Sequence, residues 1–221
     1  QNFSQVTNPP IDSLRENKVM SLRTRFGNLG NILNFDNLTK ENIYVLDTPI
    51  LSNSQFIKFK KYFEGNSKII DCTFSKNDNL KNSLDKIRSL SEAAAREGLK
   101  QLVLTDKNVN ENRLAIPMVL AVGAINSHLI KKSLRGFVSI NIETGDTLDT
   151  HSYATLLGVG ATTINPYLAF ESIRQRFNKN LFGNLNIEDC VKRYIKSVNA
   201  GLLKIMSKMG ISVLSSYRGG C

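Results

Sequence analysis

Cysteine and histidine are scarce in this 221-residue sequence, and their scarcity excludes several kinds of site. The three cysteines, Cys72, Cys190 and Cys221, are odd in number and far apart. They therefore form neither a disulfide framework nor the ligand spacing of a zinc or iron–sulfur centre. With only His128 and His151, a histidine-rich metal site is excluded, and a nucleophilic triad would have to use one of these two. Such cysteine usage is expected in a reducing compartment.

Long apolar runs and targeting signals are also missing. No run of about 18 or more apolar residues occurs, so we expect no membrane span. The first residues, Gln1–Ser4, contain neither Met nor a basic stretch followed by an apolar one, so we expect the sequence to begin inside a longer protein. The hydrophobic fraction of 41% is that of an ordinary globular protein with a buried core.

The sequence is basic, with a formal charge of +10 from 29 Lys and Arg residues against 19 Asp and Glu residues. The basic residues are spread along the chain, and their densest groups lie at 58–61, 131–132 and 174–176. None forms a block of about five like charges, and none alternates with aromatic residues as a nucleic-acid-binding surface does. We therefore favour a solvated basic surface over an acidic protein partner, and we expect no binding to nucleic acid.

Hydrophobic periodicity predicts alternating strands and helices from residue 41 to about 215. The expected strands span 44–46, 69–74, 101–105, 137–142, 161–164 and 211–214. The expected helices span 54–63, 80–94, 117–131, 148–157, 167–177 and 187–208, and a short helix is expected at 12–22 within the N-terminal segment. Such alternation is typical of an α/β fold with a mainly parallel sheet flanked by helices, of the incomplete-barrel or doubly wound type. Residues 1–40 are expected to form an irregular N-terminal segment, because Asn8–Pro10 excludes a helix interior.

Capping residues mark several helix boundaries. Asn186 is the expected N-cap of helix 187–208, and Asp78 or Asn79 is that of the helix beginning at residue 80. Gly98 is expected to end the latter helix in the left-handed conformation. The expected apolar face of 187–208 consists of Val191, Ile195, Val198, Leu202, Ile205 and Met209.

Ligands of parallel α/β folds bind at the carboxyl ends of strands, so the residues after each expected strand are candidate site residues. These are Asp71–Cys72, Thr105–Lys107, Glu143–Asp146 and Asn165–Tyr167. Asp106 and Glu143 would suit acid–base catalysis, and Lys107 would suit phosphate binding. We favour the plainer interpretation, in which Asp106 opens a turn, Glu143 is solvated or caps a helix, and Lys107 is solvated.

Other motifs predict structure rather than chemistry. Gly158 and Gly160 lie between an expected helix and an expected strand, the reverse of the dinucleotide-binding order, so we expect a helix end and a tight loop. No P-loop motif is present. Cys72 is expected to be a small buried residue, and the polar group Asp149–Ser152 lies too close in one helix for nucleophile–base geometry. The residues therefore predict no catalytic, cofactor-binding or metal-binding site.

Three longer segments resemble the large subunits of glutamate synthases, in the order and approximate spacing of their central domain. The matching segments are Gln5–Asp12 with Leu14–Glu16 and Met20–Leu22, then Ile164–Glu171, then Gly201–Ser212 with Ser216–Gly219. The resemblance extends over nearly the whole chain, and we assign residues 1–221 to this one domain. Cys221, where the family often has Gln, is a mild departure.

The resemblance implies a multidomain oxidoreductase of glutamate biosynthesis and ammonia assimilation. In that family, an N-terminal amidotransferase domain with a cysteine nucleophile hydrolyses glutamine, and ammonia passes through an internal tunnel to a domain that carries FMN and a 3Fe-4S cluster. The central domain connects the two and is expected to hold neither cofactor. The implied partners are the neighbouring domains and either ferredoxin or a small NAD(P)H-oxidising subunit. The implied location is the bacterial cytoplasm or the plastid stroma.

The resemblance also implies roles for two segments. Thr7 and Asn8 are expected to line the ammonia tunnel, beside two prolines that make the backbone rigid. The residues expected to contact the FMN domain are Lys208, Met209, Gly210, Ile211 and Ser212. The alternative is a simple helix end at Gly210 with Ile211 in the core.

Two further interpretations remain open from the residues alone. In the first, the chain is a stand-alone α/β enzyme in which Asp106, Lys107 and Glu143 converge in one pocket. In the second, the basic chain is a docking module for an acidic electron-transfer protein.

Overall fold

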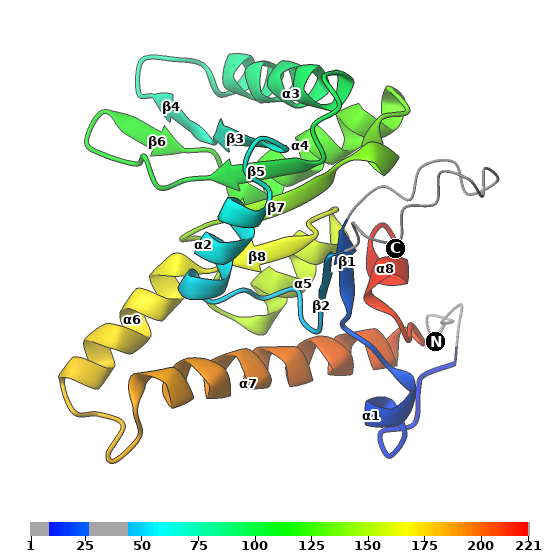
Figure 1. Cartoon of the computed structure of the whole chain (residues 1–221), viewed down its shortest axis with the longest axis vertical. Helices are drawn as coiled ribbons and strands as arrows, with labels where there is room; N and C mark the ends of the chain where they lie inside the picture. The colour runs from blue at the N-terminus through cyan, green and yellow to red at the C-terminus, as the bar shows by residue number, and fades with distance from the viewer. Residues whose placement is uncertain (1–8, 27–43, 221) are drawn as a thin grey trace, which may run out of the picture.

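The computed structural model describes residues 9–26 and 44–220, which form a layered α/β fold (Figure 1). Its helices are α1 (Glu16–Val19), α2 (Asn53–Tyr62), α3 (Leu80–Arg96), α4 (Met118–Lys131), α5 (Thr150–Gly158), α6 (Tyr167–Asn178), α7 (Ile187–Lys208) and α8 (Leu214–Tyr217). Its strands are β1 (Thr24–Phe26), β2 (Tyr44–Leu46), β3 (Ser67–Asp71), β4 (Thr73–Ser75), β5 (Gln101–Thr105), β6 (Arg113–Ala115), β7 (Ser139–Glu143) and β8 (Thr163–Asn165). A 3-10 helix, η3 (Arg135–Phe137), precedes β7. Among these helices, none combines the length and the apolar character needed to cross a membrane.

Four parallel strands form the central sheet in the order β3-β5-β7-β8. One row of paired residues crosses the sheet from Ile69 through Val103 and Asn141 to Thr163. Beyond β8 the sheet continues into the segment before α2, since Ile50 forms a parallel bridge with β8. The expected α/β fold, with a mainly parallel sheet flanked by helices, is confirmed.

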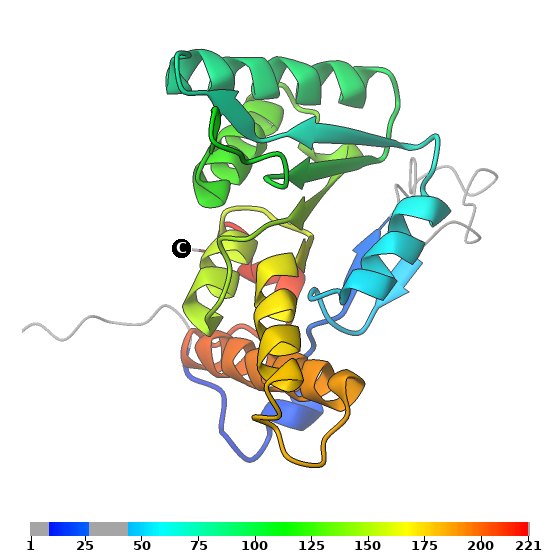
Figure 2. The same cartoon turned by 90° about the vertical axis from the view of Figure 1, so that its left-hand side faces the viewer.

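One face of the sheet is apolar and packs against α3, α4 and α5 (Figure 2). Alternate side chains of a strand point to the same face, so this face carries a regular set of aliphatic residues. The set consists of Ile70, Leu102, Leu104, Ile140, Ile142 and Ile164, all fully buried. Complete burial of one such side chain contributes roughly 1.5–3 kcal/mol, so this layer supplies a large part of the stability.

The opposite face is covered by α2 and the antiparallel β1–β2 pair, and it is mixed in character (Figure 2). Val103 packs there against a cluster made of Phe26, Leu51, Phe56, Phe59 and Phe63. Beside this cluster, Asn141 donates from Nδ2 to Gln101 Oε1 at 2.9 Å and accepts at Oδ1 from Thr163 Oγ1 at 2.7 Å. This buried polar row defines the strand register, because a one-residue slip would turn it against the apolar helices.

Several helix ends lie where the sequence predicts them. At α2, the side chains of Ser52 and Gln55 form a capping box. Asn186 accepts from the backbone N–H of Asp189 at 2.8 Å and begins α7. Gly98 has a φ of +85° after the end of α3, which confirms the left-handed helix end.

The strand predicted at 69–74 is instead two strands. The Oδ1 atom of Asp71 accepts from both the backbone N–H and the hydroxyl of Thr73, at 2.9 and 2.7 Å, and this turn separates β3 from β4 at Cys72. β4 then pairs in the antiparallel sense with β6, outside the central sheet. The prediction failed because an aspartate-centred turn lies inside an otherwise continuous apolar and β-branched run.

Two predictions were wrong for the same reason. The helix predicted at 12–22 is shorter, and the segment predicted as a strand at 211–214 is not a strand. The helix is limited to α1, because Ser21 leaves it and donates its backbone N–H to the carbonyl of Ser212 at 2.8 Å. Residues 211–213 form only a single parallel bridge, between Val213 and Ser21, and Leu214 already begins α8. Pairing between the two distant segments therefore replaces the local structure that each would favour alone.

Gly201 determines how closely α7 packs against α5. An added Cβ there would lie 2.5 Å from Cγ2 of Thr150, whereas one added at Gly123 in α4 would meet nothing within 4 Å. Gly123→Ala is expected to raise the free energy of unfolding by about 0.5–1 kcal/mol through helix propensity. Gly201→Ala is expected to lower it by about 1–2 kcal/mol, because overpacking outweighs that gain. The two variants are compared by urea denaturation. Equal stabilisation would show that α5 and α7 can move apart to accept the methyl group without a loss of stability.

Candidate functional site

The carboxyl ends of the parallel strands bring together charged side chains that are distant in sequence. Glu143, the last residue of β7, is 5% exposed. Its Oε1 accepts from Lys107 Nζ at 2.8 Å and Lys60 Nζ at 3.3 Å, and its Oε2 accepts from Thr105 Oγ1 at 3.0 Å. These four residues form the strand-end cluster: Lys60, Thr105, Lys107 and Glu143.

The two lysines determine the charge of Glu143. Burial raises the pKa of this carboxyl group, but the hydrogen bond from Lys107 and the charges of both lysines outweigh burial, so the pKa is lowered. Glu143 is therefore ionised at neutral pH and neutralised by its partners. A general acid or base needs a pKa near the working pH, so the strand-end cluster is built as a structural ion pair.

Asp106 follows β5 at the same edge of the sheet and is 3% exposed, but its carboxylate binds a loop instead of the side chains of the strand-end cluster. Its Oδ2 accepts from Thr144 Oγ1 at 2.6 Å and from the backbone N–H of Gly145 at 3.0 Å. Its own carbonyl accepts from the N–H of Val109 at 3.3 Å. The prediction that Asp106 opens a turn is confirmed.

The predictions for Glu143 and Lys107 need correction. Glu143 is neither solvated nor a helix cap, and Lys107, although half-exposed, is bound to it. The second partner, Lys60, lies 83 residues before Glu143, so no local pattern indicates this ion pair. The carboxylate of Asp106 bonds to neither Lys107 nor Glu143, although its backbone N–H donates to the carbonyl of Glu143 at 3.3 Å. None of the three residues lines the cleft described below. The geometry therefore offers no support for a stand-alone enzyme built on these residues.

Asp71, at the end of β3, anchors the β4–β6 pair to the same edge. Its Oδ2 accepts from Arg113 Nη2 at 2.9 Å and from Asn108 Nδ2 at 3.0 Å. Burial raises the pKa of Asp71, but the hydrogen bonds from Thr73 and Asn108 and the charge of Arg113 outweigh it, so the pKa is lowered. This carboxylate is also neutralised within the domain.

Cysteine and histidine side chains take structural roles. Cys72 is fully buried, as predicted, and burial raises the pKa of its thiol to about 12. His128 Nε2 lies 2.7 Å from Glu92 Oε2 across the contact between α3 and α4. Asp149 accepts from the backbone N–H of Ser152 at 2.8 Å and caps α5. In the described part of the chain, no three His, Cys, Asp or Glu side chains gather as metal ligands would.

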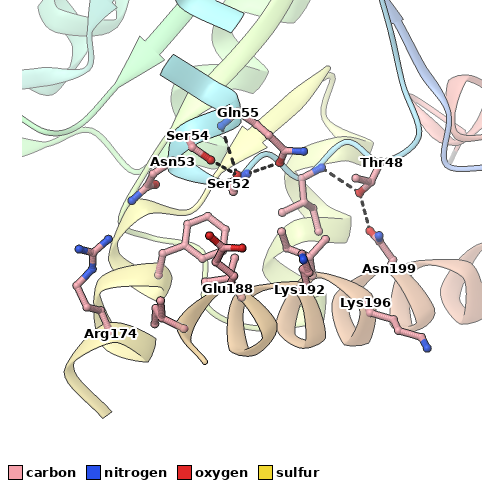
Figure 3. Close-up of a pocket in the computed structure, with 15 residues that line it drawn as sticks. Thr48, Ser52, Asn53, Ser54, Gln55, Arg174, Glu188, Lys192, Lys196 and Asn199 are labelled. Carbon is pink, nitrogen blue, oxygen red and sulfur yellow. Dashed lines mark hydrogen bonds between the residues drawn. The ribbon is translucent and has the colours of Figure 1, made fainter. Parts of the chain in front are cut away.

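A cleft of about 780 Å³ lies between the N-terminal end of α2, α6 and α7 (Figure 3). Its apolar lining consists of Ile50, Phe170, Ile187, Val191 and Ile195. Its charged lining consists of Arg174, Glu188, Lys192 and Lys196. Thr48 Oγ1 donates to Asn199 Oδ1 at 2.7 Å across one end of the cleft.

Sequence reasoning did not single out this cleft. Val191 and Ile195 were predicted on the apolar face of 187–208, and their spacing is the one signal that points to it. The cleft combines an apolar lining with three cations and one carboxylate, so its chemistry suits an apolar segment that carries negative charge.

The resemblance singles out two segments, and only the second lies within the described residues. Thr7 and Asn8 lie outside the described residues. Residues 208–212 end α7, with a φ of +67° at Gly210 and with Ile211 packed against the core. Lys208 is exposed at the surface, and residues 209–212 are half-buried.

The chain matches the family model described as the glutamate synthase central domain over residues 1–221. It is 50% identical to the NADPH glutamate synthase large chain of Azospirillum brasilense, covering 100% of this chain and 15% of that protein. It is 41% identical to the NADPH large chain of Bacillus subtilis, covering 99% of this chain and 14% of that one. It is also 41% identical to the ferredoxin-dependent glutamate synthase of Pyropia yezoensis, covering 99% and 15%.

Among solved structures, a flavocytochrome b2 variant with sulfite bound is similar at 13% identity and a TM-score of 0.49, covering 77% of this chain and 38% of that one. A likeness this distant carries no argument about function. The relatives named above are oxidoreductases of much greater length, and this chain spans about 15% of the first of them. From its family match and these identities, the chain belongs to the glutamate synthase central domain family.

Proposed function

We propose that this chain joins the amidotransferase and FMN domains within a glutamate synthase large chain, and that it helps to form the tunnel through which ammonia passes between them. The whole enzyme would make glutamate from glutamine and 2-oxoglutarate. The proposal rests on family membership together with one feature of the fold, the position of the two ends of the described chain.

Both ends of the described chain lie on the side of the molecule where the parallel strands begin (Figure 1). Near the N-terminal end, Ile11 donates its backbone N–H to Ser207 O at the end of α7, at 2.9 Å. Near the C-terminal end, Gly219 donates its N–H at 2.9 Å to the carbonyl of Gly158, shortly before β8. Domains attached at both ends would therefore leave from one side of this domain and lie near each other, as a short ammonia path requires.

Thr7 and Asn8 are the proposed tunnel residues. They come just before Pro9 and Pro10, whose fixed φ angles stiffen the approach to the anchored Ile11. A hydroxyl and an amide hydrogen-bond ammonia without protonating it, which suits a path that must deliver the free base. Residues 208–212 follow the same anchor, so we propose them as the contact with the FMN domain.

The cofactors and the electron donor belong to other parts of the proposed enzyme. FMN and a 3Fe-4S cluster are proposed for the neighbouring domain. In this domain Cys72, in the turn between β3 and β4, and Cys190, in α7, are both buried and lie in separate parts of the fold. Relatives are named as NADPH-, NADH- or ferredoxin-dependent, so the proposed donor is either ferredoxin or an NAD(P)H-oxidising subunit. The cytoplasm or the plastid stroma is the proposed location. The cleft beside α7, with its basic lining, favours a second role as a docking surface for an acidic partner.

The tunnel role is tested in the full-length large chain with the double substitution Thr7→Val and Asn8→Leu. Removing both polar groups is expected to leave glutamine hydrolysis intact while part of the ammonia escapes to solvent. The measurement is the ratio of ammonia released to 2-oxoglutarate consumed, with Asn112→Leu, an exposed position near β6, as the matched control. A ratio unchanged from the wild type would contradict the tunnel role.

A further inference from the structure

Arg218, which follows α8, is poorly satisfied in the described structure. Its Nε atom is buried and has no hydrogen-bond partner, and its Nη2 reaches only the carbonyl of Thr162, at 3.5 Å. An arginine presents five N–H donors in a planar fork. An unmade hydrogen bond at a buried charged group is more costly than one at a neutral group.

A second arginine adds to the imbalance. Arg135, in η3, donates to the carbonyls of Val138 and Gly160 at 2.6 and 2.8 Å, and to Asn126 Oδ1 at 2.6 Å. Its partners are thus neutral oxygen atoms. Arg218 binds a carbonyl two residues after Gly160, so both guanidinium groups lie at the loop that leads into β8.

No carboxylate balances these two cations within the described residues, where neither arginine takes part in a salt bridge. Burial and repulsion from Arg135 lower the pKa of Arg218 to about 10, so it still carries its charge at neutral pH. Two neighbouring, partly buried cations without a counter-charge are unfavourable unless an anion binds them. The carbonyl oxygens around them supply hydrogen bonds but no full negative charge.

We propose that Arg218, together with Arg135, forms a carboxylate-binding site for an Asp or Glu side chain from a part of the large chain outside these 221 residues. A carboxylate matches the guanidinium fork in shape and charge, and a bidentate pair is stronger than a bond to a carbonyl. The position fits such a source, because Arg218 lies on the side from which both ends of the described chain leave. The inference rests on the proposed function only in taking this domain to be part of a longer chain.

The test uses the full-length large chain. A cryo-EM structure is expected to show a carboxylate oxygen of a residue outside this domain within salt-bridge distance of the Arg218 guanidinium. A structure in which Arg218 meets only backbone carbonyls, water or a free inorganic anion would overturn the site. The result is independent of ammonia escape, so failure of the tunnel proposal and failure of this site can be told apart.

Hydrogen exchange of the same chain gives a second measurement. Arg218→Met is expected to speed amide exchange in the segment that carries the partner carboxylate, by roughly tenfold or more. Arg218→Lys keeps the charge without the fork and should show a smaller increase. The control is Arg193→Met on the exposed side of α7, which should change nothing there. Faster exchange confined to residues 158–162 and α8, with none outside the domain, would mean that Arg218 serves only local packing.

Discussion

Replacing Gly160 with alanine is expected to lower the free energy of unfolding by about 2–5 kcal/mol. Gly160 has a φ of +123°, a conformation that residues with a Cβ rarely adopt, and such strain costs on the order of 1–3 kcal/mol. An added Cβ would also lie 2.5 Å from Oδ1 of Asn126. That oxygen accepts from Arg135 Nε, so the substitution would also disturb the support of this arginine. Urea denaturation measures the loss.

Gly65→Ala is the matched control for this prediction. Gly65 also has a positive φ, +81°, but an added Cβ would meet nothing within 4 Å. The free energy of unfolding of Gly65→Ala should fall only by the cost of the left-handed conformation, about 1–2 kcal/mol. If both variants lost the same amount, the contact with Asn126 would have no energetic weight, and the close approach of the loop to α4 would not need glycine.

Removing the charge of Glu143 is the other substitution with a large expected effect. Glu143→Gln keeps the side-chain shape but leaves Lys60 and Lys107 without their shared carboxylate. It is expected to lower the free energy of unfolding at neutral pH by about 1.5–3 kcal/mol, the range for hydrogen bonds to charged groups. Glu171→Gln is the control, because Glu171 is half-exposed and its pair with Arg174, at 3.8 Å, should contribute little.

The effect of Glu143→Gln should depend on pH in one direction. The pKa of Glu143 is lower in the folded chain than its usual value of about 4.3, so its stabilisation is fully present above that value. It is lost as the pH falls through the lowered pKa. The stabilities of the wild type and the variant should therefore converge as the pH falls from about 4.3 towards the lowered pKa, as followed by denaturation at several pH values. A difference that stayed constant into the acid range would show that the ion pair contributes nothing.

The central α/β layer was predictable because its signals are local. The apolar spacing of 187–208 and the cap at Asn186 are both contained in one segment, and α7 has the predicted bounds. The buried strand at 101–105 and the glycine end at Gly98 are similar cases. In each, propensity, periodicity and burial favour the same structure, so the tertiary fold has nothing to override.

The rest depended on partners that are distant in sequence. Ser21 and Val213 show no mutual signal, yet their pairing shortens α1 and replaces a predicted strand. Lys60 belongs to a helix whose apolar spacing was evident, but nothing in that helix indicates Glu143 as its partner. The proposed arginine site has no local signal in the sequence, because Arg135 and Arg218 are 83 residues apart. Polar and charged contacts of this kind are set by topology, which a single sequence does not display.

The pairing of the N-terminal segment with residues 207–214 has a consequence for synthesis on the ribosome. Within this domain Ile11 and Ser21 are made early, but their backbone partners Ser207 and Ser212 are made about 190 residues later. Contacts with such a large sequence separation form late. During translation, any domain that precedes this one would be held by an unanchored tether until α8 has left the ribosome. Only then would its orientation be set, so residues 207–214 would determine the position of Ile11 and Ser21.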